Sequence, residues 1–134
     1  GAIDYRLNLL FDERSIQVLA YNFETLLAEK LETVISRNIA NTRPRDFYDI
    51  YILYRLHFKD CNPVILDQAI KETASKRGSL PVIRNYRQII PEIAANKKMH
   101  DFWKKYQKDY SYAAGIDFKE ICQIIAKLLD ELGF

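Results

Sequence analysis

The charged residues best placed for chemistry lie on two neighbouring predicted helices. Lys30 falls inside the apolar stripe of the first helix, between Leu26 on one side and Val34 on the other, and Arg37 falls on the same side. An ammonium at such a position either extends its charge to water or meets an anion, because an unpaired buried charge is costly. The spacing leaves both interpretations open.

The second predicted helix carries two carboxylates on one side of an otherwise apolar rod, because Asp46 and Asp49 are three residues apart. Asp46 lies in the first turn, where the helix dipole favours a carboxylate, whereas Asp49 has no such explanation. Together with Lys30 and the nearby Arg43 and Arg45, they indicate either a structural ion-pair network or the edge of a phosphate-handling site. Residue types alone do not choose between the two.

Proline and asparagine residues divide the chain into the helices that would hold these side chains. Asn22 is a candidate N-cap, and Pro44 and Pro63 suit first helical turns. We predict five helices, at about residues 22–39, 44–58, 63–77, 97–112 and 117–133. The second is apolar around nearly its whole circumference, which is typical of a central, buried helix. Residues 79–95 stay ambiguous because of Pro81 and Pro91, and a short helical turn at 86–90 is one option.

The predicted helix at 97–112 has an apolar face and a basic face. We expect its apolar residues in the core: Met99, Phe102, Trp103, Tyr106 and Tyr110. Residues 71–108 contain ten Lys or Arg and three acids, a balance of +7, while the remainder holds ten basic and fifteen acidic residues, or −5. Such clustering fits a nucleic-acid-facing surface, but a solvated helix face gives a similar run. The candidate surface residues are Lys97, Lys98, Lys104, Lys105 and Lys108.

Two runs within the first 21 residues place apolar side chains at alternate positions, which predicts a β-hairpin. Tyr5 to Phe11 forms the first alternating run, and Ile16 to Ala20 forms the second. A two-stranded hairpin is marginal alone, so we interpret it as the remnant of a larger sheet. The expected organisation is a hairpin at 1–21, left from an N-terminal domain, and a mainly α, bundle-like domain at 22–134. Gly1, in place of an initiator Met, fits a piece of something longer.

Composition limits the class of protein. With 134 residues, 49% of them hydrophobic and 28% charged, the chain can bury one ordinary core. We find no apolar run of the length of a membrane helix and no signal sequence, so we expect a cytoplasmic protein. Cys61 and Cys122 have no spacing typical of a disulfide framework or a zinc site, and we expect no metal site in this chain.

Four runs of residues resemble a known family. The run Ala28-Glu29-Lys30-Leu31 and the run Arg43-Pro44-Arg45-Asp46-Phe47-Tyr48-Asp49 resemble the paired AEKL and RxxDxxD motifs of the AbiEii/AbiGii abortive-infection toxins. Residues 75–79 are similar to an Arg-Gly-Thr stretch in that family, and residues 102–106 to its late tryptophan helix. The likeness covers the C-terminal part of such a toxin.

The resemblance implies a polymerase-β-like nucleotidyltransferase that uses Mg²⁺ and a nucleoside triphosphate, sometimes with tRNA as acceptor, and that is paired with an antitoxin. By this resemblance Lys30 would hold triphosphate oxygens and Asp46 would complete the active site, with Asp49 as a further candidate. The candidate phosphate-binding residues are Lys30, Arg37, Arg43 and Arg45.

The sequence departs from the family at the motifs expected to bind metal. Family members begin with a Gly-Ser loop and an Asp-x-Asp pair, but this sequence contains no Asp-x-Asp, and its single Gly-Ser, at Gly78-Ser79, follows the candidate residues. We therefore expect that an N-terminal half is missing, that this chain binds no cofactor and is inactive alone, and that Mg²⁺ and nucleotide bind the full-length enzyme. The alternatives are a non-catalytic helical module that binds RNA or protein, and a metal-independent ribonuclease.

Overall fold

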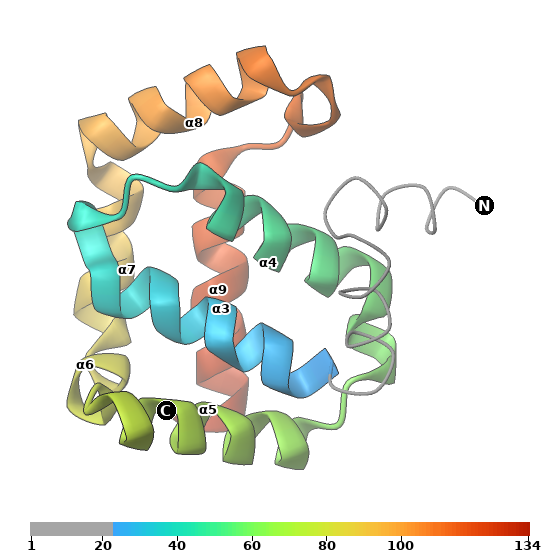
Figure 1. Ribbon diagram of the computed structural model, residues 1–134, viewed down its shortest axis with the longest axis vertical. Coiled ribbons are helices and arrows are strands. Elements are labelled where there is room, and N and C mark those ends of the chain that lie inside the picture. The colour runs from blue at the N-terminus through green and yellow to red at the C-terminus, as the bar shows by residue number, and fades with distance from the viewer. Residues whose placement is uncertain (1–22) are drawn as a thin grey trace.

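The computed structural model describes residues 23–134, all of which belong to helices or to the short turns between them (Figure 1). No strand occurs within this range, so the mainly α class is confirmed. The predicted hairpin at 1–21 and the Asn22 cap lie outside the described residues. The elements are α3 (Phe23–Arg37), η1 (Asn38–Ala40), α4 (Pro44–His57), η2 (Phe58–Asp60), α5 (Pro63–Arg77), α6 (Leu80–Arg84), α7 (Tyr86–Ala95), α8 (Lys97–Asp109), η3 (Ser111–Ala113) and α9 (Phe118–Leu132).

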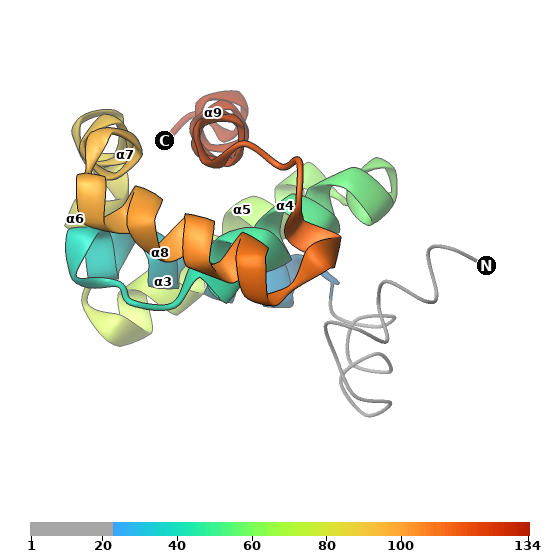
Figure 2. The ribbon, with the colours of Figure 1, turned by 90° about the horizontal axis from the view of Figure 1, so that it is seen from above.

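The helices form two layers closed at one end by a crossing helix. Helix α3 packs between α4 and α5, and α7 packs against α9. Seen from above, the pair of α7 and α9 lies over the layer of α3, α4 and α5, and α8 runs across the end of both (Figure 2). Helix α4 also contacts α9, so the two layers share one core.

Side-chain caps and left-handed glycines fix where the helices begin and end. Asn62 accepts hydrogen bonds from the backbone amides of Val64 and Ile65 at the start of α5, and Asp117 accepts one from Lys119 at the start of α9. Gly78 ends α5 with a φ of 68° and Gly133 ends α9 with a φ of 81°. The predicted bounds of these two helices, 63–77 and 117–133, are confirmed to within one residue.

Helix α4 is the central helix that its sequence predicts. Phe47, Ile50 and Leu53 are completely buried, and Tyr48 and Ile52 are 1% exposed. The ring of Phe47 meets that of Phe118 on α9 edge-on, with centroids 5.0 Å apart. Packing on several sides leaves this helix little freedom to rotate, so it fixes the positions from which its side chains project.

The segment 79–95, which the sequence leaves ambiguous, forms two helices, α6 and α7. Pro81 lies in the first turn of α6, where no backbone hydrogen bond is lost. Pro91 lies inside α7 and is exposed, while Tyr86, Ile90 and Ile93 on the same helix are buried. Burial of this apolar stripe against α9 outweighs the hydrogen bond that the proline removes.

Candidate functional site

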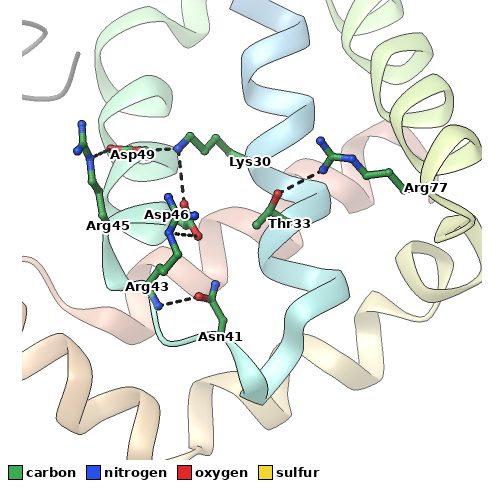
Figure 3. Close-up of polar contacts among 8 residues, drawn as sticks. All are labelled: Lys30, Thr33, Asn41, Arg43, Arg45, Asp46, Asp49 and Arg77. Atoms are coloured by element: carbon green, nitrogen blue, oxygen red, sulfur yellow. Dashed lines mark hydrogen bonds and ion pairs between the residues drawn. The ribbon is translucent and has the colours of Figure 1, made fainter. Parts of the chain in front are cut away.

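Lys30 and the two aspartates converge between α3 and α4 (Figure 3). The Nζ atom of Lys30 lies 2.8 Å from Asp49 Oδ2 and 3.6 Å from Asp46 Oδ1. The Lys30 side chain is 21% exposed, whereas those of Asp46 and Asp49 are 3% and 1% exposed. The structure therefore brings together the three residues that the sequence marks as catalytic candidates, with the lysine as the only member that reaches solvent to a substantial extent.

The short connection between α3 and α4 sets this geometry. Asn38 takes a positive φ of 51°, a conformation that asparagine tolerates better than most residues, and so turns the chain at the end of α3. Three residues before the start of α4, the buried Asn41 accepts a hydrogen bond from the backbone amide of Arg43 at 2.7 Å. Pro44 then begins α4 and places Asp46 in its first turn.

Three buried carboxylate oxygens lack a hydrogen-bond partner among the described residues: Asp46 Oδ2 and both oxygens of Asp49. Of these, Asp49 Oδ2 is ion-paired with Lys30, so Asp46 Oδ2 and Asp49 Oδ1 are the ones without a close partner. The cations that face them are distant, because Arg43 Nε lies 3.9 Å from Asp46 Oδ2 and Arg45 Nε lies 3.8 Å from Asp49 Oδ1. Both arginine side chains are more than half exposed. Such orphaned acceptors are costly to bury, so they mark a site where a further partner would be stabilising.

Burial raises the pKa of Asp49 above its ordinary value, and the neighbouring Asp46 adds to the rise. The charge of Lys30, its hydrogen bond to the carboxyl group and the charge of Arg45 oppose the effect of burial. Counting Arg43, the cluster has three cationic and two acidic side chains. An anion that approached Lys30 from solvent would meet a small positive excess.

Arg37 does not join the cluster. It is exposed in the last turn of α3, two turns beyond Lys30. Among residues 23–134, no ion pair links it to either aspartate. A role for Arg37 in binding phosphate stays a prediction.

A second cluster, which the sequence analysis missed, lies on the other side of α3, where Figure 3 shows Arg77 approaching Thr33. Glu32 is 3% exposed and forms an ion pair with Arg77, and the hydroxyl of Ser79 donates to Glu32 Oε1 at 3.0 Å. The stretch at 75–79 therefore ties the junction of α5 and α6 to α3. The sequence did contain a signal for a buried Glu32, because the residues one helical turn before and after it, Ala28 and Ile35, are apolar.

The five candidate surface lysines of α8 are all exposed. At 100° per residue they span about 120° of the helix circumference. Met99, Trp103 and Tyr106 are buried on the opposite side, as the sequence predicts. The role of this basic face in nucleic-acid binding stays a prediction.

Two aromatic residues of this helix are not in the core, contrary to the expectation. Phe102 is 36% exposed and Tyr110 is 50% exposed. Phe102 lies at the edge of the apolar stripe, and Tyr110 follows the last residue of α8 with extended backbone angles. Because Tyr110 lies beyond the end of the helix, helical periodicity does not predict which way its side chain faces. Both line a pocket of about 450 Å³ between the start of α4 and α8, which Arg43 and Arg45 also line.

The oxygens of Asp46 and Asp49 do not by themselves fit Mg²⁺. This ion takes a near-octahedral set of oxygen ligands, but the ammonium of Lys30 contacts both carboxylates. Within residues 23–134, no group of three or more His, Cys, Asp or Glu side chains could hold a metal ion. Any metal at this cluster would need further oxygens from elsewhere.

The sequence profile of one family, described as nucleotidyl transferase AbiEii toxins of type IV toxin–antitoxin systems, matches residues 1–124. The chain belongs to the AbiEii family. The resemblance carried by Lys30, Asp46 and Asp49 thus extends over most of the sequence. No curated protein and no solved structure matches the chain significantly.

Membership of a type IV toxin–antitoxin family implies an antitoxin as partner of this AbiEii chain. None of the helices between residues 23 and 134 combines the length and the apolar content that crossing a membrane requires. The family description names the class of reaction.

Proposed function

We propose that this AbiEii chain contributes Lys30, Asp46 and Asp49 to the active site of a nucleotidyltransferase that moves a nucleotide from a nucleoside triphosphate to an RNA acceptor such as tRNA. The observation that carries the proposal is the ammonium of Lys30, held at 2.8 Å and 3.6 Å from two buried carboxylates. Family membership supports the class of reaction.

The chemistry of phosphoryl transfer fits these residue types. Catalysis in such reactions consists mainly of positioning the phosphates and cancelling the charge that develops on them. An ammonium is a compact phosphate partner, and the two aspartates orient it by holding it from one side. Arg43 and Arg45 present more than half of their side-chain surface to solvent beside it, and guanidinium groups bind phosphate oxygens bidentately.

The orphaned oxygens give the aspartates a role beyond orienting Lys30. Asp46 Oδ2 is buried without a hydrogen-bond donor among the described residues. In the proposal it accepts a hydrogen bond from a hydroxyl group of the substrate after a local rearrangement exposes it. In the proposal this oxygen completes the active site around the reacting groups. Asp49, whose Oδ2 is closest to Lys30, serves mainly to position the ammonium.

The metal pair of the enzyme would come from another segment or chain. The sequence contains no Asp-x-Asp, and the donor set around Lys30 does not fit Mg²⁺. We therefore assign Mg²⁺ and the Gly-Ser loop to an N-terminal nucleotidyltransferase half, which would bring its carboxylates to the open side of the cluster. By this proposal the 134-residue chain is inactive alone.

The test compares the 134-residue chain with a protein that also contains the segment encoded upstream. Transfer of radiolabelled nucleotide from an α-labelled triphosphate mixture to total tRNA is measured, together with growth arrest on expression. The longer protein should label RNA, and Lys30→Ala or Asp46→Ala should abolish both labelling and growth arrest. Lys127→Ala, which removes an exposed lysine of α9, is the matched control and should change neither.

Two outcomes would contradict the proposal. Retained labelling in both Lys30→Ala and Asp46→Ala would reject the assignment of the site. Labelling by the 134-residue chain alone would show that another segment is not needed to supply the metal pair.

A second candidate function is a helical module that binds RNA without catalysis, and the exposed lysines on one side of α8 favour it. Binding of this kind weakens steeply with salt because each phosphate contact releases counterions. Neutralising Lys104, Lys105 and Lys108 together should lower affinity for tRNA and flatten its salt dependence. RNA binding by a longer protein that never labels RNA would favour this function over transfer.

A further inference from the structure

The pocket between the start of α4 and α8 combines arginines that the proposed function already uses with exposed aromatic rings that it does not explain. Its volume of about 450 Å³ lies in the range of small-molecule sites. One wall is formed by Arg43 and Arg45, and the other by Phe102, Lys105 and Tyr110. The pocket is thus lined by cations and aromatic rings together.

Two aromatic residues that line the pocket, Phe102 and Tyr110, are exposed although buried aromatic residues lie close to them in the chain. Phe102 and Tyr110 are 36% and 50% exposed, whereas the adjoining Trp103 and Tyr106 are 3% and 5% exposed. The Tyr110 ring is held by a neighbouring ring, because its centroid lies 4.8 Å from that of Tyr106 in an edge-on contact. A supported, exposed ring is a platform on which a planar group can stack at little entropic cost.

The charges of the pocket favour a phosphate backbone. Arg43, Arg45 and Lys105 line it together with a single acid, Asp109. The two arginines also face the carboxylates of the Lys30 cluster, with their Nε atoms 3.9 Å and 3.8 Å from Asp46 and Asp49. The pocket therefore adjoins the proposed phosphate-handling site and shares two residues with it.

We propose that this pocket binds an unstacked base of a single-stranded RNA segment, with Phe102 and Tyr110 as stacking surfaces and Arg43, Arg45 and Lys105 on the adjacent phosphates. Bases inside a duplex cannot present their faces, so the preference should be for single strands. The inference rests on the proposed transferase function and identifies where the acceptor strand lies. A protein partner of acidic character would satisfy the cations but has no need of the exposed rings.

The test measures binding of the 134-residue chain to a fluorescein-labelled oligouridylate and to the same strand in a duplex with oligoadenylate, by fluorescence anisotropy at several salt concentrations. The single strand should bind more tightly than the duplex. Phe102→Ala and Tyr110→Ala should each weaken its binding about tenfold without changing the salt dependence. Lys105→Ala should weaken binding and reduce the salt slope by about one.

The controls come from the same chain. Val82→Ala removes an exposed apolar side chain of α6, and Lys127→Ala removes an exposed lysine of α9. Neither should change affinity. Both stacking residues are partly exposed, and unchanged circular dichroism spectra would show that their variants remain folded.

Three results would overturn the proposal: no binding of the single strand, equal affinity for the duplex, or full affinity in both aromatic variants. Loss of binding in Lys105→Ala alone would indicate a charged patch of the kind that acidic proteins also recognise, and would reject the stacking pocket. The labelling assay tests the two proposals separately. If the longer protein transfers nucleotide and neither Phe102→Ala nor Tyr110→Ala changes the rate, the pocket is rejected and the transferase function stands.

Discussion

The ammonium of Lys30 lies 2.8 Å from Asp49 Oδ2, so α3 and α4 meet through an ion pair within an otherwise apolar interface. Both helices would pack as well with apolar residues at these positions, because buried ion pairs seldom add stability over a hydrophobic contact of the same shape. The pair is therefore better explained by what it can bind than by what it contributes to folding.

Removing only the lysine should destabilise the protein. In Lys30→Ala two carboxylates with nearly no exposure lose the cation between them, and the cost of breaking such a pair is about 3 kcal/mol of unfolding free energy. Urea denaturation followed by circular dichroism measures it. Lys127→Ala, on an exposed face, should change the same quantity by less than about 0.5 kcal/mol. Equal stability of both variants would contradict the burial of the pair.

The raised pKa of Asp49 gives a pH dependence with a definite sign. Because the folded state binds this proton more tightly than the unfolded state, ionisation of Asp49 opposes folding, and its contribution to stability falls as pH rises above the ordinary value of 3.8. Asp49→Asn lacks this ionisation. The unfolding free energy of the variant minus that of the wild type should therefore increase between acidic and neutral pH, measured by urea denaturation across that range. A difference that decreases would mean that Lys30 outweighs burial.

We expect the Glu32 cluster to contribute to the unfolding free energy and not to the affinity for RNA. Arg77→Ala leaves a buried carboxylate with the hydroxyl of Ser79 as its remaining described hydrogen-bond donor, which should cost about 2 kcal/mol of unfolding free energy. Affinity for oligouridylate should stay within twofold of the wild type, because the cluster lies on the side of α3 away from Lys30. Arg84→Ala, at an exposed position of α6, is the control for loss of one arginine. A loss of RNA affinity confined to Arg77→Ala would contradict a structural role.

We expect substitution of Gly78 to lower the unfolding free energy because of its backbone conformation and not because of steric overlap. Its φ of 68° lies in the left-handed region, while a Cβ atom added there would meet nothing within 4 Å. Gly78→Ala should therefore lower the unfolding free energy by about 1 kcal/mol, and Gly78→Asn by less, because asparagine tolerates this region. Thermal unfolding of the two variants tests the order. Equal losses would indicate a steric cause instead.

Periodicity and proline positions predicted the part of the site that lies within helices. Lys30 was found inside an apolar stripe, and Pro44 indicated where the helix carrying Asp46 and Asp49 begins. When the two helices pack through their apolar faces, the ammonium of Lys30 and the carboxylates of Asp46 and Asp49 are brought close together in most arrangements. Glu32 offered the same kind of signal on another face of α3, but its partners Arg77 and Ser79 are more than forty residues away, and no local pattern joins them.

Tertiary contacts decided what the sequence left open or predicted wrongly. Pro91 sits inside α7 because burial of Ile90 and Ile93 compensates for the lost hydrogen bond. Phe102 and Tyr110 follow the aromatic pattern of the predicted helix, yet Phe102 lies at the edge of the buried stripe and the helix ends before Tyr110, so both line the pocket. The outcome depends on which neighbours cover a residue, and a single sequence does not contain that information.

The central claim is that the Lys30 cluster handles substrate rather than holding α3 to α4. The most direct test is nucleotide transfer to RNA by a longer protein carrying Lys30→Met, Asp46→Asn and Asp49→Asn together. Replacing the three buried or half-buried members by uncharged residues of similar shape leaves no buried charge unpaired, and the remaining Arg43 and Arg45 are more than half exposed, so the fold should persist by circular dichroism. The account predicts a folded protein whose transfer rate falls by about a hundredfold or more. A folded triple variant that transfers nucleotide at the wild-type rate would contradict it.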